Sequence, residues 1–257
     1  MIWIGIFAPF IGTVLGAASV YAFRDALPAA LQRTLLGFAS GVMVAASVWS
    51  LLIPAMDQCA SMGKLAFVPA ALGFLLGIFF LLLIDRLLPH LHLNDSCPEG
   101  LPCRLPRSTM MILAVTLHNL PEGMAVGITL AGFLSGDVSM SASGVLALSL
   151  GIALQNLPEG AVVSLPLKNE LKSGHKAFLA GAASGIVEPI GALLALALTS
   201  VILPALPVML SFAAGSMIYV VVEELLPEAS AGEHSNLSTL GFSAGFLLMM
   251  ILDTALQ

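Results

Sequence analysis

The chain has 257 residues, of which 58% are hydrophobic and only 9% are charged, with a formal net charge of −6. A soluble globular domain has roughly 25% charged residues, so this chain has too few to cover a surface that faces water. The acidic balance also argues against a nucleic-acid partner, and the composition predicts an integral membrane protein in a lipid bilayer.

Eight segments are long and apolar enough to cross a bilayer as helices, because a span needs about 20 mostly apolar residues. They cover residues 2–23, 34–56, 66–88, 109–133, 141–166, 175–200, 205–227 and 238–256. The connections are short except for residues 89–108. We therefore expect an all-α integral membrane protein whose single transmembrane domain covers residues 1–257.

The basic residues predict the orientation of these spans. All but one of them lie after spans one, three, five and seven: Arg24, Arg33, Arg86, Arg104, Arg107, Lys168, Lys172 and Lys176. The other connections contain only Lys64. Since cytoplasmic loops collect Lys and Arg, both termini should be extracytoplasmic and the 89–108 loop cytoplasmic. The cell (inner) membrane is the expected location.

One six-residue motif occurs twice, in successive spans. Residues 118–123 read His-Asn-Leu-Pro-Glu-Gly, and residues 155–160 read Gln-Asn-Leu-Pro-Glu-Gly. Because successive spans run antiparallel, the two copies form an inverted pair near the membrane midplane. Such pairs are typical of transporters, so we expect an inverted-repeat transporter bundle.

The spacing within each motif places its polar side chains on one helix face. Positions i and i+4 share a face, and the amides that follow the first residue lie in the same broad arc. Each span therefore presents a small set of metal-ligating groups to one cavity: His118, Asn119 and Glu122 from the first motif, and Gln155, Asn156 and Glu159 from the second.

The charge balance inside the spans is the decisive observation. Acids lie within the spans at Glu122, Glu159, Glu188 and at one or both of Glu223 and Glu224, with no Lys or Arg to pair with them. An ionised carboxylate at the bilayer centre costs about 2.5 kcal/mol or more unless it is compensated. The compensating charge must be a proton or an external cation. A histidine ligand shifts the preference from Mg²⁺ and Ca²⁺ toward Zn²⁺, Fe²⁺, Mn²⁺ or Co²⁺, and the thioether of Met43 could admit Cd²⁺.

With these paired motifs, the chain resembles the ZIP (Zrt/Irt-like) divalent metal transporters, bacterial type. The resemblance covers the whole chain: eight spans, outside termini and a longest loop after span three. It implies uptake of a divalent metal, above all Zn²⁺, into the cytoplasm, often by a homodimer. Zn²⁺ is then the transported substrate, with no catalytic cofactor and no catalytic residue.

The resemblance also implies roles for individual residues. His118, Glu122, Gln155 and Glu159 match the primary metal site, and Asn119, Asn156 and Glu188 match a second site beside it. Met43 and Ser50 match pathway residues, and Asp57 matches an acid at the extracytoplasmic mouth. Glu224, preceded by Glu223, matches an acid toward the exit, and His90 and His92 are possible ligands in the cytoplasmic loop.

Three positions depart from the family pattern. Asn156 stands where Asp is frequent, Glu223 stands where His is usual, and Gln155 replaces a His. Asn156 lowers the negative charge at the second metal site, and Glu223 makes the exit more acidic. Gln155 weakens the expectation of strict zinc selectivity.

Other functions remain open at this point. Lone intramembrane acids also build proton-conducting relays, and a bound metal could serve an intramembrane hydrolase or a non-transporting sensor. The hydrolase reading lacks the His-Glu-x-x-His motif. Two further acids are expected to be structural: Asp253 as a solvated terminal residue, and Asp85 in an interfacial ion pair with Arg86.

Overall fold

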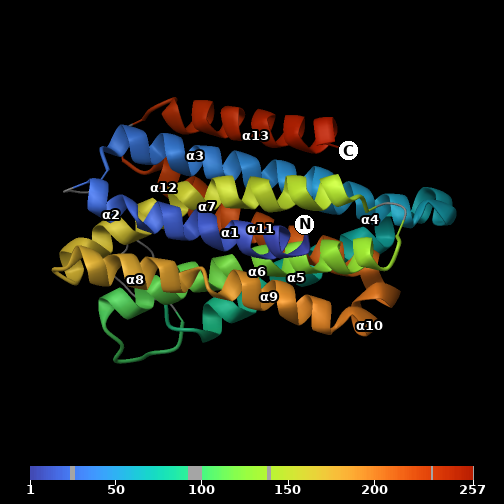
Figure 1. Ribbon diagram of the computed structural model, residues 1–257, viewed down its shortest axis with the longest axis horizontal. Helices are drawn as coiled ribbons and strands as arrows, with labels where there is room; N and C mark the ends of the chain where they lie inside the picture. Colours follow the sequence, from blue (N-terminus) through green and yellow to red (C-terminus); the bar gives the residue numbers. More distant parts are fainter. Residues whose placement is uncertain (24–26, 92–99, 138–139, 233, 257) are drawn as a thin grey trace.

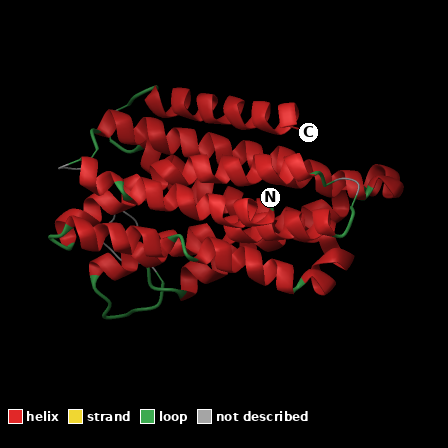
Figure 2. Cartoon of the chain, in the orientation of Figure 1, coloured by secondary structure: helices red, strands yellow, loops and turns green. Residues whose placement is uncertain are grey.

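The computed structural model describes residues 1–23, 27–91, 100–137, 140–232 and 234–256. Within these ranges the chain is helical, without strands, and its long helices run side by side in one bundle (Figures 1 and 2). Eight helical segments are long and apolar enough to span a membrane. The predicted all-α fold with eight membrane-spanning segments is thereby confirmed.

The first four segments are built from α1 (Ile2–Ala17) with α2 (Ser19–Ala22); α3 (Ala29–Ala46) with η1 (Ser47–Leu52) and α4 (Ile53–Gln58); α5 (Phe67–Leu87); and α6 (Arg107–Leu134). The last four are α7 (Ala142–Glu170); α8 (Gly174–Ser184) with α9 (Val187–Ala197); α10 (Thr199–Ile202) with η3 (Leu203–Ala205), α11 (Leu206–Val220), η4 (Val221–Leu225) and α12 (Leu226–Ser230); and α13 (Leu237–Leu256). A short 3₁₀ segment, η2 (Ala60–Leu65), joins the second and third. Both chain ends lie on the right of Figure 1, away from residues 100–106 at the lower left.

Two segments contain a turn of wider π-helix, and each turn ends two residues before a proline. The turn η1 contains Ser50 and comes before Pro54, and η4 contains Glu223 and Glu224 and comes before Pro227. A proline cannot donate a hydrogen bond to the carbonyl four residues earlier, so the helix must rearrange there. Such π-turns are frequent at functional sites, and here they coincide with candidate pathway residues.

The sixth segment is broken in its middle. The helix α8 ends at Ser184 and α9 begins at Val187, so the break comes just before Pro189. Pro189 cannot donate to the Gly185 carbonyl, and the Glu188 amide donates to that carbonyl instead, at 3.0 Å. The break places Glu188 in the first turn of α9, at the centre of the bundle.

The helices pair through small residues. The closest pairs are α1 with α7, α6 with α9, α3 with α13 and α5 with α11. At Gly12 of α1, an added Cβ atom would collide with the Ala153 carbonyl of α7, and at Gly41 of α3 it would collide with the Phe242 carbonyl of α13. Helices pack in lipid by close approach of backbones at small residues, so these contacts hold the pairs together.

The α1–α7 contact predicts that alanine substitution of two glycines in α1 affects protein stability differently. Gly12→Ala should destabilise the protein by roughly 1–3 kcal/mol because the new methyl group overpacks the contact. Gly5→Ala is the matched control, since its nearest new contact would be Ser149 Oγ at 3.4 Å. Thermal denaturation in detergent should show a melting temperature lowered only in Gly12→Ala, and equal melting temperatures would contradict the packing described for α1.

Candidate metal-binding site

The two motif helices bring both copies of the motif together. The helices α6 and α7 contact each other and run in opposite directions around the short connection at residues 135–141 (Figure 1). Gln155 Nε2 of α7 donates a hydrogen bond to Glu122 Oε1 of α6, at 2.7 Å. The inverted repeat seen in the sequence is therefore a direct contact in the structure.

A pocket with a mostly apolar lining and four titratable side chains opens beside this contact. Its acidic and basic lining residues are His118 of α6, Glu159 of α7, Glu224 of η4 and Glu228 of α12. Leu91 also lines it, which places the pocket on the side of the bundle nearest the 89–108 connection. The pocket has a water-accessible volume of about 40 Å³, which is room for a few water molecules.

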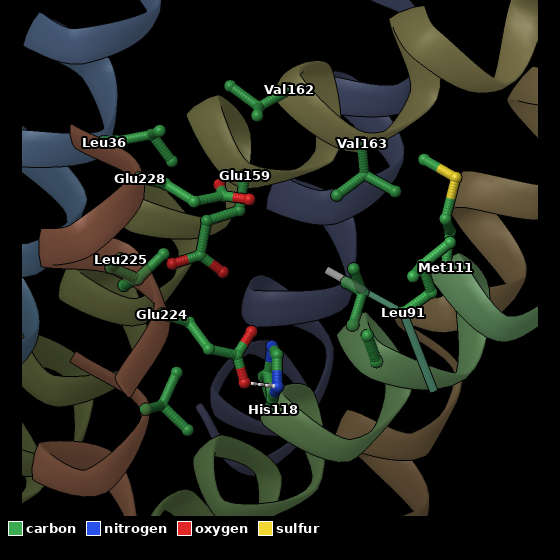
Figure 3. Close-up of a pocket in the computed structure, with 13 residues that line it drawn as sticks. Leu36, Leu91, Met111, His118, Glu159, Val162, Val163, Glu224, Leu225 and Glu228 are labelled. Carbon is green, nitrogen blue, oxygen red and sulfur yellow. Dashed lines mark ion pairs between the residues drawn. The ribbon is translucent and has the colours of Figure 1, made fainter. Parts of the chain in front are cut away.

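The side chains of the pocket converge from different helices. Figure 3 shows the Glu159 carboxyl between those of Glu228 and Glu224, with His118 below. His118 Nε2 pairs with Glu224 Oε1, as the dashed line marks. Glu224, predicted for the exit, is thus a direct neighbour of His118, predicted for the primary site.

A second polar group lies deeper and is shielded from solvent. Glu122 and Glu188 are 0% exposed and Asn156 is 1% exposed. The Asn156 amide lies next to both carboxyls, yet neither of its polar atoms makes a hydrogen bond of regular geometry. Asn119 has a different partner, because its Nδ2 donates to the Ser184 carbonyl at the end of α8, at 3.3 Å.

Thr13 of α1 completes this deeper group. Its hydroxyl donates to Glu188 Oε1 at 2.6 Å. The partners of the buried acids are therefore an amide and a hydroxyl, which are neutral. They satisfy one carboxyl oxygen each and leave the charge uncompensated.

Three buried glutamates each have one carboxyl oxygen without a hydrogen-bond partner in the described structure. These atoms are Glu122 Oε2, Glu159 Oε1 and Glu188 Oε2. The Lys and Arg residues of the described α-helices lie near helix ends, at Arg33, Arg86, Arg107, Lys168 and Lys176. Lys168 is occupied there, donating to the carbonyls of Val20 and Phe23. Anionic oxygens without a fixed cation suit an external cation as ligand.

The site is not a closed metal cage as it stands. Within the described ranges, no three His, Cys, Asp or Glu side chains converge closely enough to hold a metal ion. His118 faces Glu224, and Gln155 holds Glu122. Binding an ion by the predicted primary set therefore requires these two pairs to open and the side chains to turn toward one another.

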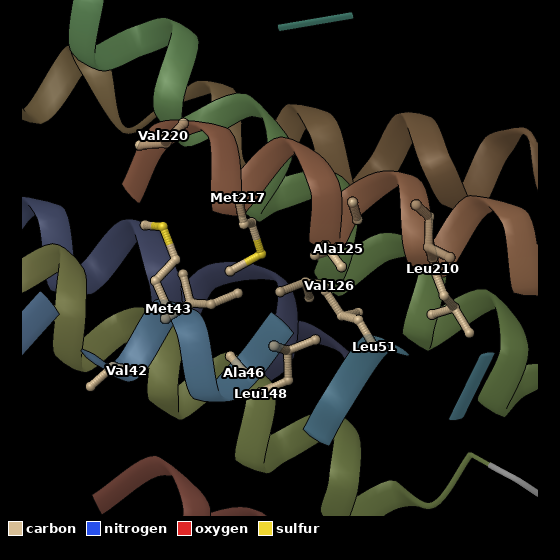
Figure 4. Packing of buried hydrophobic residues seen from close by; sticks show 14 of the residues in the cluster. Val42, Met43, Ala46, Leu51, Ala125, Val126, Leu148, Leu210, Met217 and Val220 are labelled. Carbon is tan, nitrogen blue, oxygen red and sulfur yellow. The ribbon is translucent and has the colours of Figure 1, made fainter. Parts of the chain in front are cut away.

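Other predicted residues lie outside this group. Met43 is 1% exposed and packs with Met217 and Val220 in an apolar cluster (Figure 4). Asp57 is exposed on α4, and Glu223 is exposed and does not line the pocket. The pocket thus includes Glu224 but neither Met43, Asp57 nor Glu223.

Of the two histidines predicted as loop ligands, the structure describes only His90. His90 is fully buried, with Nδ1 at 2.8 Å from the Leu88 carbonyl and Nε2 at 2.9 Å from Asp85 Oδ1. His92 lies outside the described residues. Asp85 also accepts a hydrogen bond from Tyr219 at 3.1 Å, so the expected partner Arg86 is replaced by His90 and Tyr219.

Sequence reasoning missed or misassigned several polar residues. Asp253, expected to be solvated, is 0% exposed and accepts a hydrogen bond from Ser50 at 2.8 Å. Glu228 lines the pocket, although no role was predicted for it. Thr13 was overlooked, and the available signal was that it is the single hydroxyl residue in an otherwise apolar α1.

These features define a multi-pass membrane protein with a polar, acid-rich site between its helices. A family model described as "ZIP Zinc transporter" matches residues 101–253. The chain belongs to this ZIP family, as the resemblance implied. The family comprises transporters, not enzymes, and this overturns the hydrolase alternative.

Relatives from distant organisms align over nearly the whole chain. Zinc transporter ZIPB of Bordetella bronchiseptica is 39% identical over 97% of this chain and 79% of its own length. Zinc transporter GufA of Myxococcus xanthus is 36% identical over 95% of this chain and 94% of its own. Zinc transporter ZIP11 of Homo sapiens is 34% identical over 95% and 94%, respectively.

The geometry of α6 predicts which of its positions a polar reagent reaches. With the native cysteines replaced by serine, Val115→Cys should react with a cationic methanethiosulfonate because Val115 lines the pocket. Val126→Cys is the matched control, since Val126 is 0% exposed in the apolar core. We expect Val115→Cys to react roughly tenfold faster or more, because thiol reactivity requires exposure.

The same experiment in oriented vesicles tests on which side the pocket opens. Reaction of Val115→Cys should be fast only from the side that carries the 89–108 connection. Equal reaction from both sides, or equal rates at the two positions, would contradict the pocket described here.

Proposed function

We propose that this protein takes up divalent transition metal ions, chiefly Zn²⁺, into the cytoplasm across the cell membrane. The observation that carries the proposal is the set of unpartnered oxygens on Glu122, Glu159 and Glu188. Glu122 and Glu188 have only neutral donors, and Glu159 lies among other carboxyls. The names of the relatives, all zinc transporters, support zinc as the substrate. Cd²⁺, Fe²⁺, Mn²⁺ and Co²⁺ fit the same donors and are further candidates.

The proposed primary site consists of His118, Glu122, Gln155 and Glu159. Glu159 lies within electrostatic range of Glu122, Glu188, Glu224 and Glu228, so a cation at this position relieves repulsion among several carboxyls. Binding of an ion would break the Gln155–Glu122 hydrogen bond and the His118–Glu224 pair. Because each displaced pair re-forms after the ion leaves, the site is suited to transient binding.

The proposed second site uses Asn119, Asn156 and Glu188. The proximity of Asn156 to both Glu122 and Glu188 supports it. The hydrogen bond from Asn119 to Ser184 counts against Asn119 as a ligand in this conformation. With an uncharged amide at position 156, this site should bind a divalent ion more weakly than the primary one.

The proposed path begins at Asp57 and passes Met43 and Ser50 before it reaches the primary site. It continues past Glu224 and Glu228 to the cytoplasm, where His90 and His92 are the proposed receiving ligands. His90 could accept an ion only after its contacts with Leu88 and Asp85 open. The pocket beside Leu91 supports an opening on the loop-rich side, and the basic loops support that side as cytoplasmic. Met43 lies in a dry apolar cluster in this conformation, so helices must move before an ion passes it.

Such a movement is the basis of alternating access. The helices α1, α7 and α8 contact one another, α9 contacts α1, and α6 is tightly paired with α9, whereas α3 pairs with α13 and α5 with α11. The two helix sets also meet where α3 contacts α7 and α11 contacts α6, so a rocking of one set against the other would have to shear these two contacts. A homodimer is a further part of the proposal and rests on the family resemblance.

Substitution of the pocket residues tests the proposed site. Glu159→Gln and His118→Ala in proteoliposomes should each lower Zn²⁺ uptake roughly 10- to 100-fold, because each removes a donor from the ion. Glu170→Gln on the same helix as Glu159 is the matched control, since Glu170 is half exposed and pairs with Arg107 at 3.6 Å. Uptake that is equal in all four proteins would remove the site assignment.

Proton conduction is the second candidate function, because protons can also compensate buried carboxylates. Vesicles loaded with a pH-sensitive dye distinguish the two. With a pH gradient and no metal, the metal transporter proposed here should acidify the lumen no faster than Glu159→Gln does. Rapid proton flux that needs no metal and is lost in Glu159→Gln would favour the proton-conducting alternative.

A further inference from the structure

Thr13 occupies an unusual position for a residue of the first helix. It is 2% exposed, and its hydroxyl lies 2.6 Å from Glu188 Oε1 but 3.5 Å from the Pro9 carbonyl. A threonine in a membrane helix often donates only to the carbonyl four residues earlier. The two distances show that the carboxyl of Glu188, on another helix, is here the main acceptor.

Two glycines on neighbouring helices pack closely against Thr13. An added Cβ atom at Gly160, the last residue of the second motif, would lie 2.5 Å from the Thr13 carbonyl oxygen. One at Gly185, where the sixth segment breaks, would lie 2.9 Å from Thr13 Cβ and Cγ2. The backbone of Thr13 is therefore clamped against α7 and its side chain against the break, so the hydroxyl has little freedom to turn.

The same clamp restrains Glu188. Its backbone packs against Gly123 of the first motif, where an added Cβ would lie 2.6 Å from Glu188 Cα. With Oε1 held by Thr13, only Oε2 remains without a partner, and the side chain is fully buried. The carboxyl therefore offers one oxygen toward the space beside Asn156 and Glu122.

We propose that Thr13 is a positioning residue for the transported metal, holding Glu188 so that it presents a single oxygen, Oε2, to the ion. This inference rests on the proposed function, since it assigns a role within the same site. A donor that holds a ligand before binding reduces the side-chain freedom lost when the ion arrives. It also prevents the carboxyl from chelating with both oxygens, a mode that suits the larger Ca²⁺ better than four-coordinate Zn²⁺.

Two substitutions separate positioning from packing. Thr13→Val keeps the shape of the side chain and removes the donor, and Thr13→Ser keeps the donor and removes the methyl group. Thr13→Val should raise both the KM for Zn²⁺ uptake and the Kd for Zn²⁺ binding in detergent roughly tenfold. Loss of a side chain that holds a metal ligand typically weakens metal binding by about 10- to 100-fold, and we expect the lower end of this range. The Vmax of Thr13→Val should stay within about threefold of wild type. The Thr13→Ser variant, which keeps the hydroxyl donor, should have the KM and Kd of the wild-type protein.

Competition by Ca²⁺ is a second measurement. In Thr13→Val, Glu188 is free to chelate, so Ca²⁺ should inhibit Zn²⁺ uptake at a several-fold lower ratio of Ca²⁺ to Zn²⁺ than in wild type. A merely structural role would lower Vmax and the melting temperature together and leave KM and the calcium ratio unchanged.

The outcomes keep this inference apart from the proposed function. If Glu159→Gln abolishes uptake while Thr13→Val matches wild type in KM, Kd and calcium competition, only the role of Thr13 is overturned. The same holds if Thr13→Ser fails to restore KM and Kd. If wild-type protein neither binds nor takes up Zn²⁺, the proposed function itself fails.

Discussion

The bundle is organised around carboxyl groups that lie deep among apolar helices, with no lysine or arginine of the described residues beside them. Glu122 and Glu188 are fully buried, and Glu159 is 8% exposed. An ionised group in such surroundings is costly, so each acid must share its charge with a hydrogen-bond donor, carry a proton or pair with a cation. Polar side chains such as Thr13 and Glu224 therefore pair with groups of this cluster: Thr13 with Glu188, and Glu224 with His118.

Neutral hydrogen-bond donors lower the free-energy cost of burying these carboxyls. Gln155 and Thr13 each donate one hydrogen bond to a buried carboxyl. A lysine or arginine in either place would form a buried pair that is hard to break, because removing one partner leaves an uncompensated charge. An amide and a hydroxyl hold the carboxyl in place and leave its attraction for a mobile cation intact.

The sequence was sufficient for the spans and for the pairing of the two motifs. Hydropathy and length determine a membrane helix almost independently of tertiary contacts, and the spacing of Glu122 from His118 sets a shared face. Which donor meets which acid depends on helices distant in sequence. The Ser50–Asp253 and Thr13–Glu188 bonds join residues 203 and 175 positions apart, and no local pattern contains that information.

The backbone irregularities were predictable only in part. Proline marks where a helix loses a hydrogen bond, but whether the chain then kinks, widens or breaks depends on its neighbours. Pro121 and Pro158 lie inside continuous helices, Pro54 and Pro227 follow π-turns, and Pro189 follows a break. Thr13 packs against Gly185 at that break, so the side chain that holds Glu188 also occupies the place where its helix is interrupted. Positioning of the acid and interruption of the helix are therefore one structural feature, and movement of α1 relative to α9 would alter both at once.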